Sequence, residues 1–199
     1  FQLITTGKIS QKKLLFEKQH LERLQKASRY FAFPFDQEVL RQKIEKEYQS
    51  CDIHQGYRIR ISLSKSGEIE IERQVLTPLS SNFCQAKLCQ QEADLEQAFT
   101  YFKTTYRPHL TMGNQEIIYH TVDGKLLETS IGNLVLKMDG KLYTPPSQLA
   151  LLPGIYRQHL LENGQVEEKV LTLSDLKEAE VIYACNAVRG LYELSVKEN

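Results

Sequence analysis

Apolar residues in the first quarter of the chain recur with a helical period. Leu21, Leu24 and Ala27 are three residues apart, and this spacing predicts a helix over residues 17–32 with one apolar face. Asp36 follows as a suitable N-cap, because its carboxylate can accept hydrogen bonds from the first amides of a second helix. Two successive helices are therefore expected.

The period then changes to two. Apolar and polar residues alternate over residues 57–63 and, after a Ser-Lys-Ser-Gly turn, over residues 68–72. This alternation predicts a β-hairpin with one apolar face. Residues 1–6 are a further strand-like stretch that starts at Phe1 itself, so we expect the chain to be a trimmed piece or a module whose start lies upstream.

Strand signals dominate the rest of the chain. We expect strands at residues 116–121, 127–137, 141–144, 166–172 and 180–187. Asp-Gly pairs at 123–124 and 139–140 predict tight turns between strands, whereas a Pro-Gly pair before residue 155 and a cap at Ser174 predict two short helices.

The order of these elements predicts an α+β fold with two lobes. Residues 77–82 are typical of a linker, so we expect a small N-terminal α+β lobe at residues 1–79 and a C-terminal lobe at residues 83–199. The C-terminal lobe is the one expected to be rich in strands.

Charge and composition exclude several function classes. The 25 Lys and Arg residues balance 25 Asp and Glu residues, which argues against binding to nucleic acid or to an acidic membrane surface. No apolar run approaches the ~18–20 residues that a membrane helix needs. The four cysteines lack the spacing of a zinc site, so we expect no metal, reduced thiols and a cytoplasmic protein.

Three segments carry residues suited to chemistry. Lys103 lies among aromatic and hydroxyl residues and could lose its proton near neutral pH, although most lysines are solvated. Glu128 places a carboxylate in an otherwise apolar strand, or it is a surface acid at a strand end. Residues 152–155 open a helix whose amides could bind an anion, or they are an ordinary loop.

The order of these segments resembles one known family, the fold-type IV enzymes that use pyridoxal 5′-phosphate, also called class IV aminotransferases. The carrying segments are FQLITT at residues 1–6, HLERL at 20–24, SRYFAFPFD at 28–36, FKTT at 102–105, ETSIGNL at 128–134, YTPP at 143–146, LPGIYR at 152–157, VLT at 170–172 and CNAVRG at 185–190. The resemblance covers essentially the whole chain in the family's order. It implies the two-lobed fold of this family, with a C-terminal lobe that is similar to a β-barrel with helices.

The resemblance also implies roles for individual residues. Lys103 matches the lysine that binds the cofactor's aldehyde, Glu128 matches the acid that faces the pyridine nitrogen, and Arg23 matches the arginine that binds the phosphate. The amides expected to complete the phosphate site belong to Gly154, Ile155, Tyr156, Asn186 and Ala187. Aminotransferases of the family usually carry hydroxyl residues where this chain has Tyr156 and Ala187.

Within the family, the match is closest to the 4-amino-4-deoxychorismate lyases, particularly the module fused behind an aminobenzoate synthase chain. This branch implies elimination of pyruvate to give 4-aminobenzoate for folate synthesis. Thr6 matches a threonine that could relay a proton to the leaving group, and Arg107 and Arg189 are candidates for binding substrate carboxylates. The fused lyases often carry a glutamate where this chain has Thr5.

Other readings stay open at this point. One alternative is a branched-chain or D-amino acid aminotransferase, because both reactions use the same cofactor residues. Another is a non-catalytic module of an aminobenzoate synthase chain. The family also implies a homodimer acting on a small molecule, fused to or associated with aminobenzoate synthase, without nucleic acid or membrane partners.

Overall fold

The computed structural model describes residues 1–92, 97–111 and 113–196. The chain divides into two compact units. Unit 1 consists of Phe1–Pro78 together with Phe102–Arg107, and unit 2 consists of Leu79–Tyr101 together with Pro108–Asn199. The segment that carries Lys103 therefore belongs to unit 1, although it lies in sequence beyond the expected linker.

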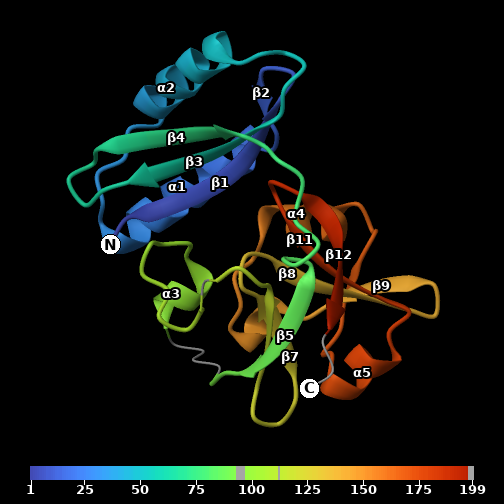
Figure 1. Cartoon of the computed structure of the whole chain (residues 1–199). Helices are drawn as coiled ribbons and strands as arrows, with labels where there is room; N and C mark the ends of the chain where they lie inside the picture. Colours follow the sequence, from blue (N-terminus) through green and yellow to red (C-terminus); the bar gives the residue numbers. More distant parts are fainter. Residues whose placement is uncertain (93–96, 112, 197–199) are drawn as a thin grey trace. The chain divides into compact units, whose positions relative to one another are not determined.

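Unit 1 is a four-stranded antiparallel sheet in the order β2-β1-β3-β4, with two helices (Figure 1). Its elements are β1 (Leu3–Ser10), β2 (Lys13–Leu14), α1 (Glu17–Phe31), α2 (Gln37–Ser50), β3 (Tyr57–Leu63) and β4 (Ile69–Val75). The two expected helices and the expected hairpin are confirmed. Asp36 caps α2 as expected, since its carboxylate accepts hydrogen bonds from the amides of Glu38 and Val39 at 2.9 and 3.2 Å.

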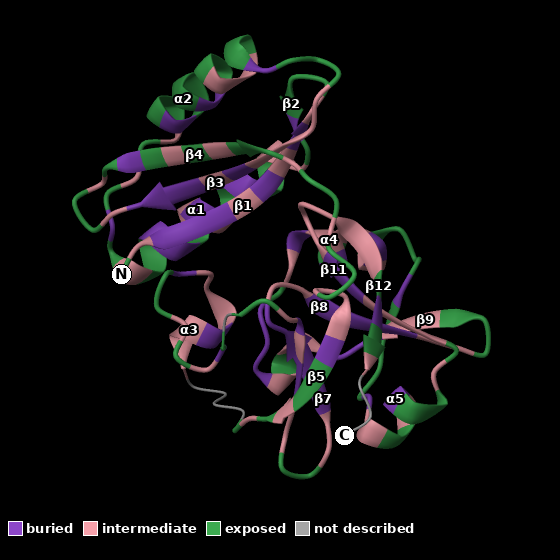
Figure 2. Ribbon diagram, viewed as in Figure 1, coloured by how far each residue is buried: buried purple, intermediate pink, exposed green. Residues whose placement is uncertain are grey.

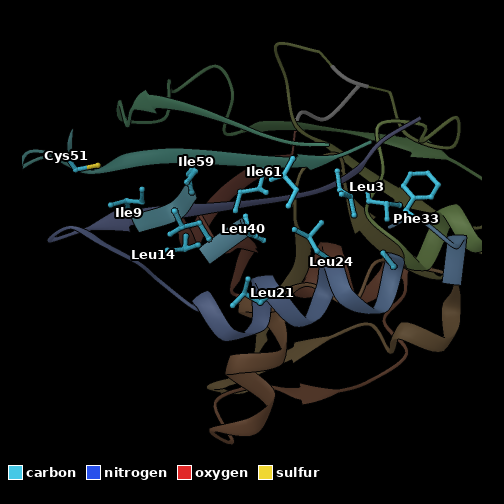
Figure 3. Close-up of a cluster of buried hydrophobic side chains, with 14 residues drawn as sticks. Leu3, Ile9, Leu14, Leu21, Leu24, Phe33, Leu40, Cys51, Ile59 and Ile61 are labelled. Atoms are coloured by element: carbon cyan, nitrogen blue, oxygen red, sulfur yellow. The ribbon is translucent and has the colours of Figure 1, made fainter. Parts of the chain in front are cut away.

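Both helices pack on one face of this sheet. Leu21 and Leu24 point from α1 toward the strands, where Ile59 and Ile61 of β3 contact them within one buried cluster, and Leu40 of α2 joins the same cluster (Figure 3). Burial of these apolar side chains is the main contribution to the stability of unit 1.

The opposite face of the sheet is more polar. Along β1 the side chains alternate, so Thr5 shares the helix-covered face with the buried Leu3, whereas Thr6 lies on the other face. Thr6 is directly opposite Arg60 of β3, and Lys8 is opposite Arg58. Directly opposed residues of antiparallel strands point to the same side, so this face carries a hydroxyl and three cationic side chains.

Unit 2 is built on strands that close into a ring. Its strands are β5 (Gln85–Gln90), β6 (Ile117–His120), β7 (Leu126–Thr129), β8 (Asn133–Met138), β9 (Lys141–Thr144), β10 (Glu167–Glu168), β11 (Val181–Asn186) and β12 (Gly190–Val196). The order β8-β11-β12-β5-β6-β7 is closed by a pairing of β7 with β8, and β9 and β10 extend the sheet beyond β8. This gives the barrel-like lobe that the family resemblance implies.

The interior of the ring is a second apolar core. Leu126, Leu134 and Leu194 are among its buried residues. Figure 2 shows buried stretches in purple along the strands of this unit. The helices of unit 2 are α3 (Ala98–Tyr101), α4 (Ile155–Glu162), α5 (Leu173–Glu178) and a 3-10 turn at Ser147–Leu149. Within the described part of the chain, no helix has the length and apolar character needed to cross a membrane.

Three expectations for unit 2 are wrong. The single strand expected at residues 127–137 is interrupted after Thr129, because residues 130–132 turn the chain back on itself to pair β7 with β8. The strand expected at residues 166–172 is reduced to β10. The cap of α5 is Thr172 rather than Ser174, since Thr172 and Asp175 bond reciprocally in a capping box.

Candidate active site

The segment that carries Lys103 is bound to the outer edge of β1. The amide of Ile4 donates a hydrogen bond of 2.9 Å to the carbonyl of Lys103, and the amide of Thr105 donates one of 2.9 Å to the carbonyl of Gln2. Between these bonds, Thr104 forms an antiparallel bridge with Leu3 and therefore shares its face. The neighbouring Lys103 then belongs to the opposite face, the one that carries Thr6.

Aromatic side chains hold the same segment against α1. The ring of Phe102 lies 4.6 Å from that of Tyr30 and 5.4 Å from that of Phe31, measured between ring centres. Such aromatic pairs contribute beyond the area they bury. The position of Lys103 is thus fixed by its backbone hydrogen bond to Ile4 and by the packing of the adjacent Phe102 against α1.

The electrostatic surroundings favour the neutral amine of Lys103. Burial, and then the charges of Arg23 and Arg107, hold the pKa of Lys103 well below its ordinary value, with smaller contributions from Arg58 and Arg60. A neutral amine is the nucleophilic and basic form of lysine. Lys103 therefore has the properties needed to attack a carbonyl or to accept a proton.

Arg23 stays cationic in the same surroundings. Burial, and then the charge of Arg107, lower its pKa to about 10, which leaves it protonated at neutral pH. Two guanidinium groups in one electrostatic neighbourhood repel each other and are stabilised by an anion between or beside them. Unit 1 thus combines a neutral amine with a cationic site suited to phosphate or carboxylate.

A buried histidine lies one helical turn before Arg23. The Nδ1 atom of His20 is 2.6 Å from the hydroxyl of Thr5, and its Nε2 atom is buried without a hydrogen-bond partner in the described part of the chain. Burial, then the charges of Arg23 and Lys103, lower the pKa of His20 to about 3, so this ring is neutral. A Cβ at Gly7 would lie 2.5 Å from Nε2, so glycine is required for this close approach.

In unit 2, Glu128 lies at the end of β7 beside a tight turn. Glu128 is 3% exposed and is opposite Asn133 of β8 in the single registered pair that joins these strands. The turn is closed by a bond from the amide of Thr129 to the carbonyl of Gly132 and by one from the amide of Gly132 to the hydroxyl of Thr129. Glu128 is therefore a buried carboxylate on a short, hydrogen-bonded hairpin.

The beginning of α4 is packed against the same hairpin. The side-chain amide of Asn133 donates a hydrogen bond of 2.8 Å to the carbonyl of Leu152, just before the N-cap Gly154. A Cβ at Gly154 would lie 1.9 Å from Oδ1 of Asn133, so only glycine fits here. Gly154 caps α4 without a side-chain hydrogen bond. Because the N-terminus of a helix favours negative charge, this end of α4 is a position suited to an anion.

The loop after β11 approaches both features. The side chain of Asn186 accepts bonds from the amides of Val188 and Arg189 at 3.0 and 2.9 Å, and its amide donates to the carbonyl of Ile131 at 3.4 Å. Gly190 has a positive φ of 68°, and a Cβ there would lie 3.4 Å from the hydroxyl of Tyr156. Within unit 2, the segments of Glu128, Gly154 and Asn186 are therefore brought together, and Ala187 lies in the same loop.

The structure assigns the expected site residues to two groups. Lys103, Arg23, Arg107 and Thr6 belong to unit 1, and the other expected residues belong to unit 2. Sequence reasoning missed His20 and Asn133 as supporting residues. The only signal for His20 was its position three residues before Arg23, which places both side chains on one helix face.

Comparison with known proteins shows the family of the chain. The family model described as amino-transferase class IV matches residues 2–195, nearly the whole chain. The chain belongs to the class IV aminotransferase family. The α+β fold and the family expected from the sequence are thereby confirmed.

Two relatives in sequence show how far individual likenesses extend. A protein of uncharacterised function from Haemophilus influenzae is 36% identical over 69 residues, which cover 35% of this chain and only 36% of that protein. A protein from Schizosaccharomyces pombe, named provisionally as an aminodeoxychorismate lyase, is 22% identical over 85% of this chain and 79% of its own length.

Solved structures share the fold at low sequence identity. One from Mesorhizobium loti, named provisionally as an amino-acid aminotransferase, has a TM-score of 0.85 at 24% identity and covers 98% of this chain and 99% of its own. A Mycobacterium tuberculosis aminotransferase of hypothetical function, in its pyridoxal phosphate-bound form, has a TM-score of 0.80 at 18% identity and covers 98% and 81%.

Pyridoxal 5′-phosphate is the cofactor of this class IV enzyme, as expected from the sequence. The residues present fit it. In unit 1, a neutral lysine suits its aldehyde and the cationic Arg23 suits an anion such as its phosphate. In unit 2, the N-terminus of α4 is likewise a kind of position that suits an anion. Glycine at position 154 allows Asn133 to approach the start of α4, because a side chain there would collide with Asn133.

Proposed function

We propose that this protein is a 4-amino-4-deoxychorismate lyase, which converts its substrate into 4-aminobenzoate and pyruvate. The observation that carries the proposal is that Thr6 and Lys103 belong to the same face of the β1 edge, with arginines beside them. This gives one unit a base, a hydroxyl donor and cations for a substrate with two carboxylates. The lyase name of the S. pombe relative supports the same assignment.

The cofactor contacts that we propose are those that the family resemblance implies for individual residues. Lys103 would hold the aldehyde carbon through Nζ, Arg23 the phosphate and Glu128 the protonated ring nitrogen. The amides of Gly154, Ile155, Tyr156, Asn186 and Ala187 would complete the phosphate site. When bound, pyridoxal phosphate supplies an electron-accepting ring that stabilises negative charge on the substrate carbon next to the amine.

Different residues of the chain would serve as the base and as the donor to the leaving group in the elimination. The amine of Lys103 would accept the proton from the ring carbon that carries the substrate's amine. Thr6 donates a hydrogen bond to the enolpyruvyl oxygen as its bond to the ring breaks, and the leaving group takes up a proton to become pyruvate. Loss of this group makes the ring aromatic. Arg107 and Arg189 would bind the substrate's carboxylates.

The main rival is an aminotransferase of the same family. A decisive assay supplies the pyridoxal phosphate-loaded protein with 4-amino-4-deoxychorismate and measures 4-aminobenzoate and pyruvate together. Parallel reactions test amino-group transfer from D-alanine, glutamate and branched-chain amino acids to a 2-oxo acid. We expect equal amounts of the two lyase products. Efficient transfer without 4-aminobenzoate would assign the aminotransferase instead.

We also propose that the enzyme acts as a homodimer in the cytoplasm, fused to or associated with an aminobenzoate synthase. The four cysteines are all free thiols, which is consistent with a reducing compartment. Sedimentation of the loaded protein tests the dimer, and a fully active monomer would contradict it.

A further inference from the structure

A second buried carboxylate is hydrogen-bonded to the turn that follows Glu128. Glu116 is 0% exposed and immediately precedes β6. Its Oε1 atom accepts hydrogen bonds from the hydroxyl of Ser130 at 2.7 Å and from the amide of Ile131 at 3.1 Å, and its Oε2 atom accepts one from the hydroxyl of Tyr192 at 2.9 Å. The proposed reaction gives this carboxylate no chemical task.

The carboxylate of Glu116 accepts hydrogen bonds from three groups of the barrel-like lobe. Moving a carboxylate from water into a protein is costly. The groups that donate to Glu116 are neutral, namely the hydroxyls of Ser130 and Tyr192 and the amide of Ile131. Burial, and then the charge of Glu116, raise the pKa of Tyr192, so the phenol stays a donor. The hydrogen bonds to Glu116 thus fix the positions of Ser130, Ile131 and Tyr192 relative to one another.

Two of these donors belong to the turn between β7 and β8. Ser130 and Ile131 follow Glu128 by two and three residues, and Ser130 also accepts a bond of 3.2 Å from the amide of Ile117 at the start of β6. The carbonyl of Ile131 accepts the bond from Asn186. The turn therefore connects Glu116 to the carboxylate proposed to face the cofactor and to the loop proposed to bind its phosphate.

The part of the turn at Gly132 and Asn133 has little freedom to shift. A Cβ at Gly132 would lie 2.7 Å from the carbonyl oxygen of Cys185, and Asn133 is tied to Leu152. Because Cys185 and Leu152 limit the movement of the hairpin at Gly132 and Asn133, we expect the direction of the turn at Ser130 and Ile131 to depend on their bonds to Glu116.

We propose that Glu116 is a positioning residue that fixes the turn at Ser130 and Ile131 and thereby aims Glu128 at the ring nitrogen of the cofactor. The inference rests on the role of Glu128 in the proposed function. It predicts that loss of the Glu116 carboxylate weakens and alters cofactor binding even where the protein stays folded.

The test compares variants by two readouts other than activity. The first is the affinity for pyridoxal phosphate, measured by titrating cofactor-free protein, and the second is the absorption spectrum of the bound cofactor. Glu128→Gln serves as the reference for a lost contact to the ring nitrogen. Glu116→Ala should bind the cofactor about tenfold more weakly, within the range found for outer partners of ligand sites, and should shift the spectrum in the direction of Glu128→Gln.

Two further variants keep the test informative if Glu116→Ala does not fold. Ser130→Ala removes one donor and should produce a smaller shift of the same sign. Glu116→Gln keeps an oxygen that can accept from Ser130 and Ile131, so it should restore most of the affinity and the spectrum. Thr144→Val is the matched control, because the buried hydroxyl of Thr144 donates 2.7 Å to the carbonyl of Leu134 without touching the turn.

The outcomes separate the inference from the proposed function. If Glu128→Gln changes the spectrum but Glu116→Ala and Ser130→Ala only lower the melting temperature, as Thr144→Val would, Glu116 is a structural residue and the inference is overturned. If Glu128→Gln itself keeps the wild-type affinity and spectrum, the role assigned to Glu128 in the proposed function fails, and the inference fails with it.

Discussion

The amide of Ile4 donates a hydrogen bond of 2.9 Å to the carbonyl of Lys103, across 99 positions of sequence. This bond places the lysine at the edge of the first strand, within the electrostatic reach of Arg23 and Arg107. A residue on a hydrogen-bonded strand edge is held more precisely than one on a free loop. The nucleophile of the proposed reaction is thus positioned by the strand that also carries Thr6.

The role of Lys103 can be tested directly. We expect Lys103→Ala to bind pyridoxal phosphate without a covalent link and to lose measurable turnover, because no other group is assigned to accept the substrate proton. Borohydride treatment followed by mass spectrometry of the intact chain measures the link. Lys87→Ala, a variant of an exposed lysine on β5, should behave as the wild type. Retention of a reducible cofactor link in Lys103→Ala would assign another lysine.

Thr6 separates the lyase from the aminotransferase. Thr6→Val is nearly isosteric and removes only the hydroxyl, so we expect a loss of about 10–100-fold in release of 4-aminobenzoate and pyruvate, up to the lower end of the usual general acid–base contribution. The cofactor spectrum should not change. Thr144→Val is the control for a lost hydroxyl elsewhere. An unchanged rate in Thr6→Val would exclude a role for Thr6 in expelling the leaving group.

His20 predicts a specific dependence of stability on pH. Its pKa is lowered from 6.5 to about 3 in the folded protein, so between these values the unfolded chain binds a proton that the folded protein does not. The free energy of unfolding must therefore fall as the pH falls through this window. We expect His20 to lower it by about 3 kcal/mol between pH 7 and pH 4. Above pH 6.5 His20 is mostly neutral in both the folded and the unfolded state, so it causes little of this loss of stability.

Urea unfolding of cofactor-free protein at several pH values measures this effect. His20→Asn should show a shallower loss of unfolding free energy between pH 7 and pH 4 than the wild type. A change at the exposed His54, His54→Asn, should leave the slope as it is. Parallel curves for the wild type and His20→Asn would mean that His20 is protonated in the folded protein.

Gly154 provides a steric prediction for the phosphate site. In Gly154→Ala the new methyl group would lie 1.9 Å from Oδ1 of Asn133, so Asn133 or the entry to α4 must shift. We expect a loss of about 1–3 kcal/mol in unfolding free energy and at least about tenfold weaker cofactor binding. Gly113→Ala is the control, because a Cβ there meets no described atom within 4 Å. Equal cofactor affinities for the two variants would remove Gly154 from the phosphate site.

The local elements of unit 1 follow from the sequence alone. The apolar spacing in α1, the capping carboxylate of Asp36 and the alternation in β3 and β4 each specify their element, because they act over a few neighbouring residues and agree with the packing that follows. The assignment of Lys103, Glu128 and Arg23 as candidates came from a resemblance in the order of motifs, and their roles stay predictions.

Only the tertiary structure decided how these residues are supported. Residues 127–137 do carry a local signal for the turn, because Ser130, Gly132 and Asn133 are typical turn residues and Thr129 bonds to Gly132. The tertiary structure adds bonds from the turn to Glu116 and Asn186, far away in sequence, and a close approach of Cys185 to Gly132. The return of Phe102–Arg107 to unit 1 is likewise a pairing with β1 between segments far apart in sequence. Patterns of a few residues encode helices and strands, whereas contacts between distant segments depend on how the whole unit packs, and the positions of Glu128 and Lys103 are set by such contacts.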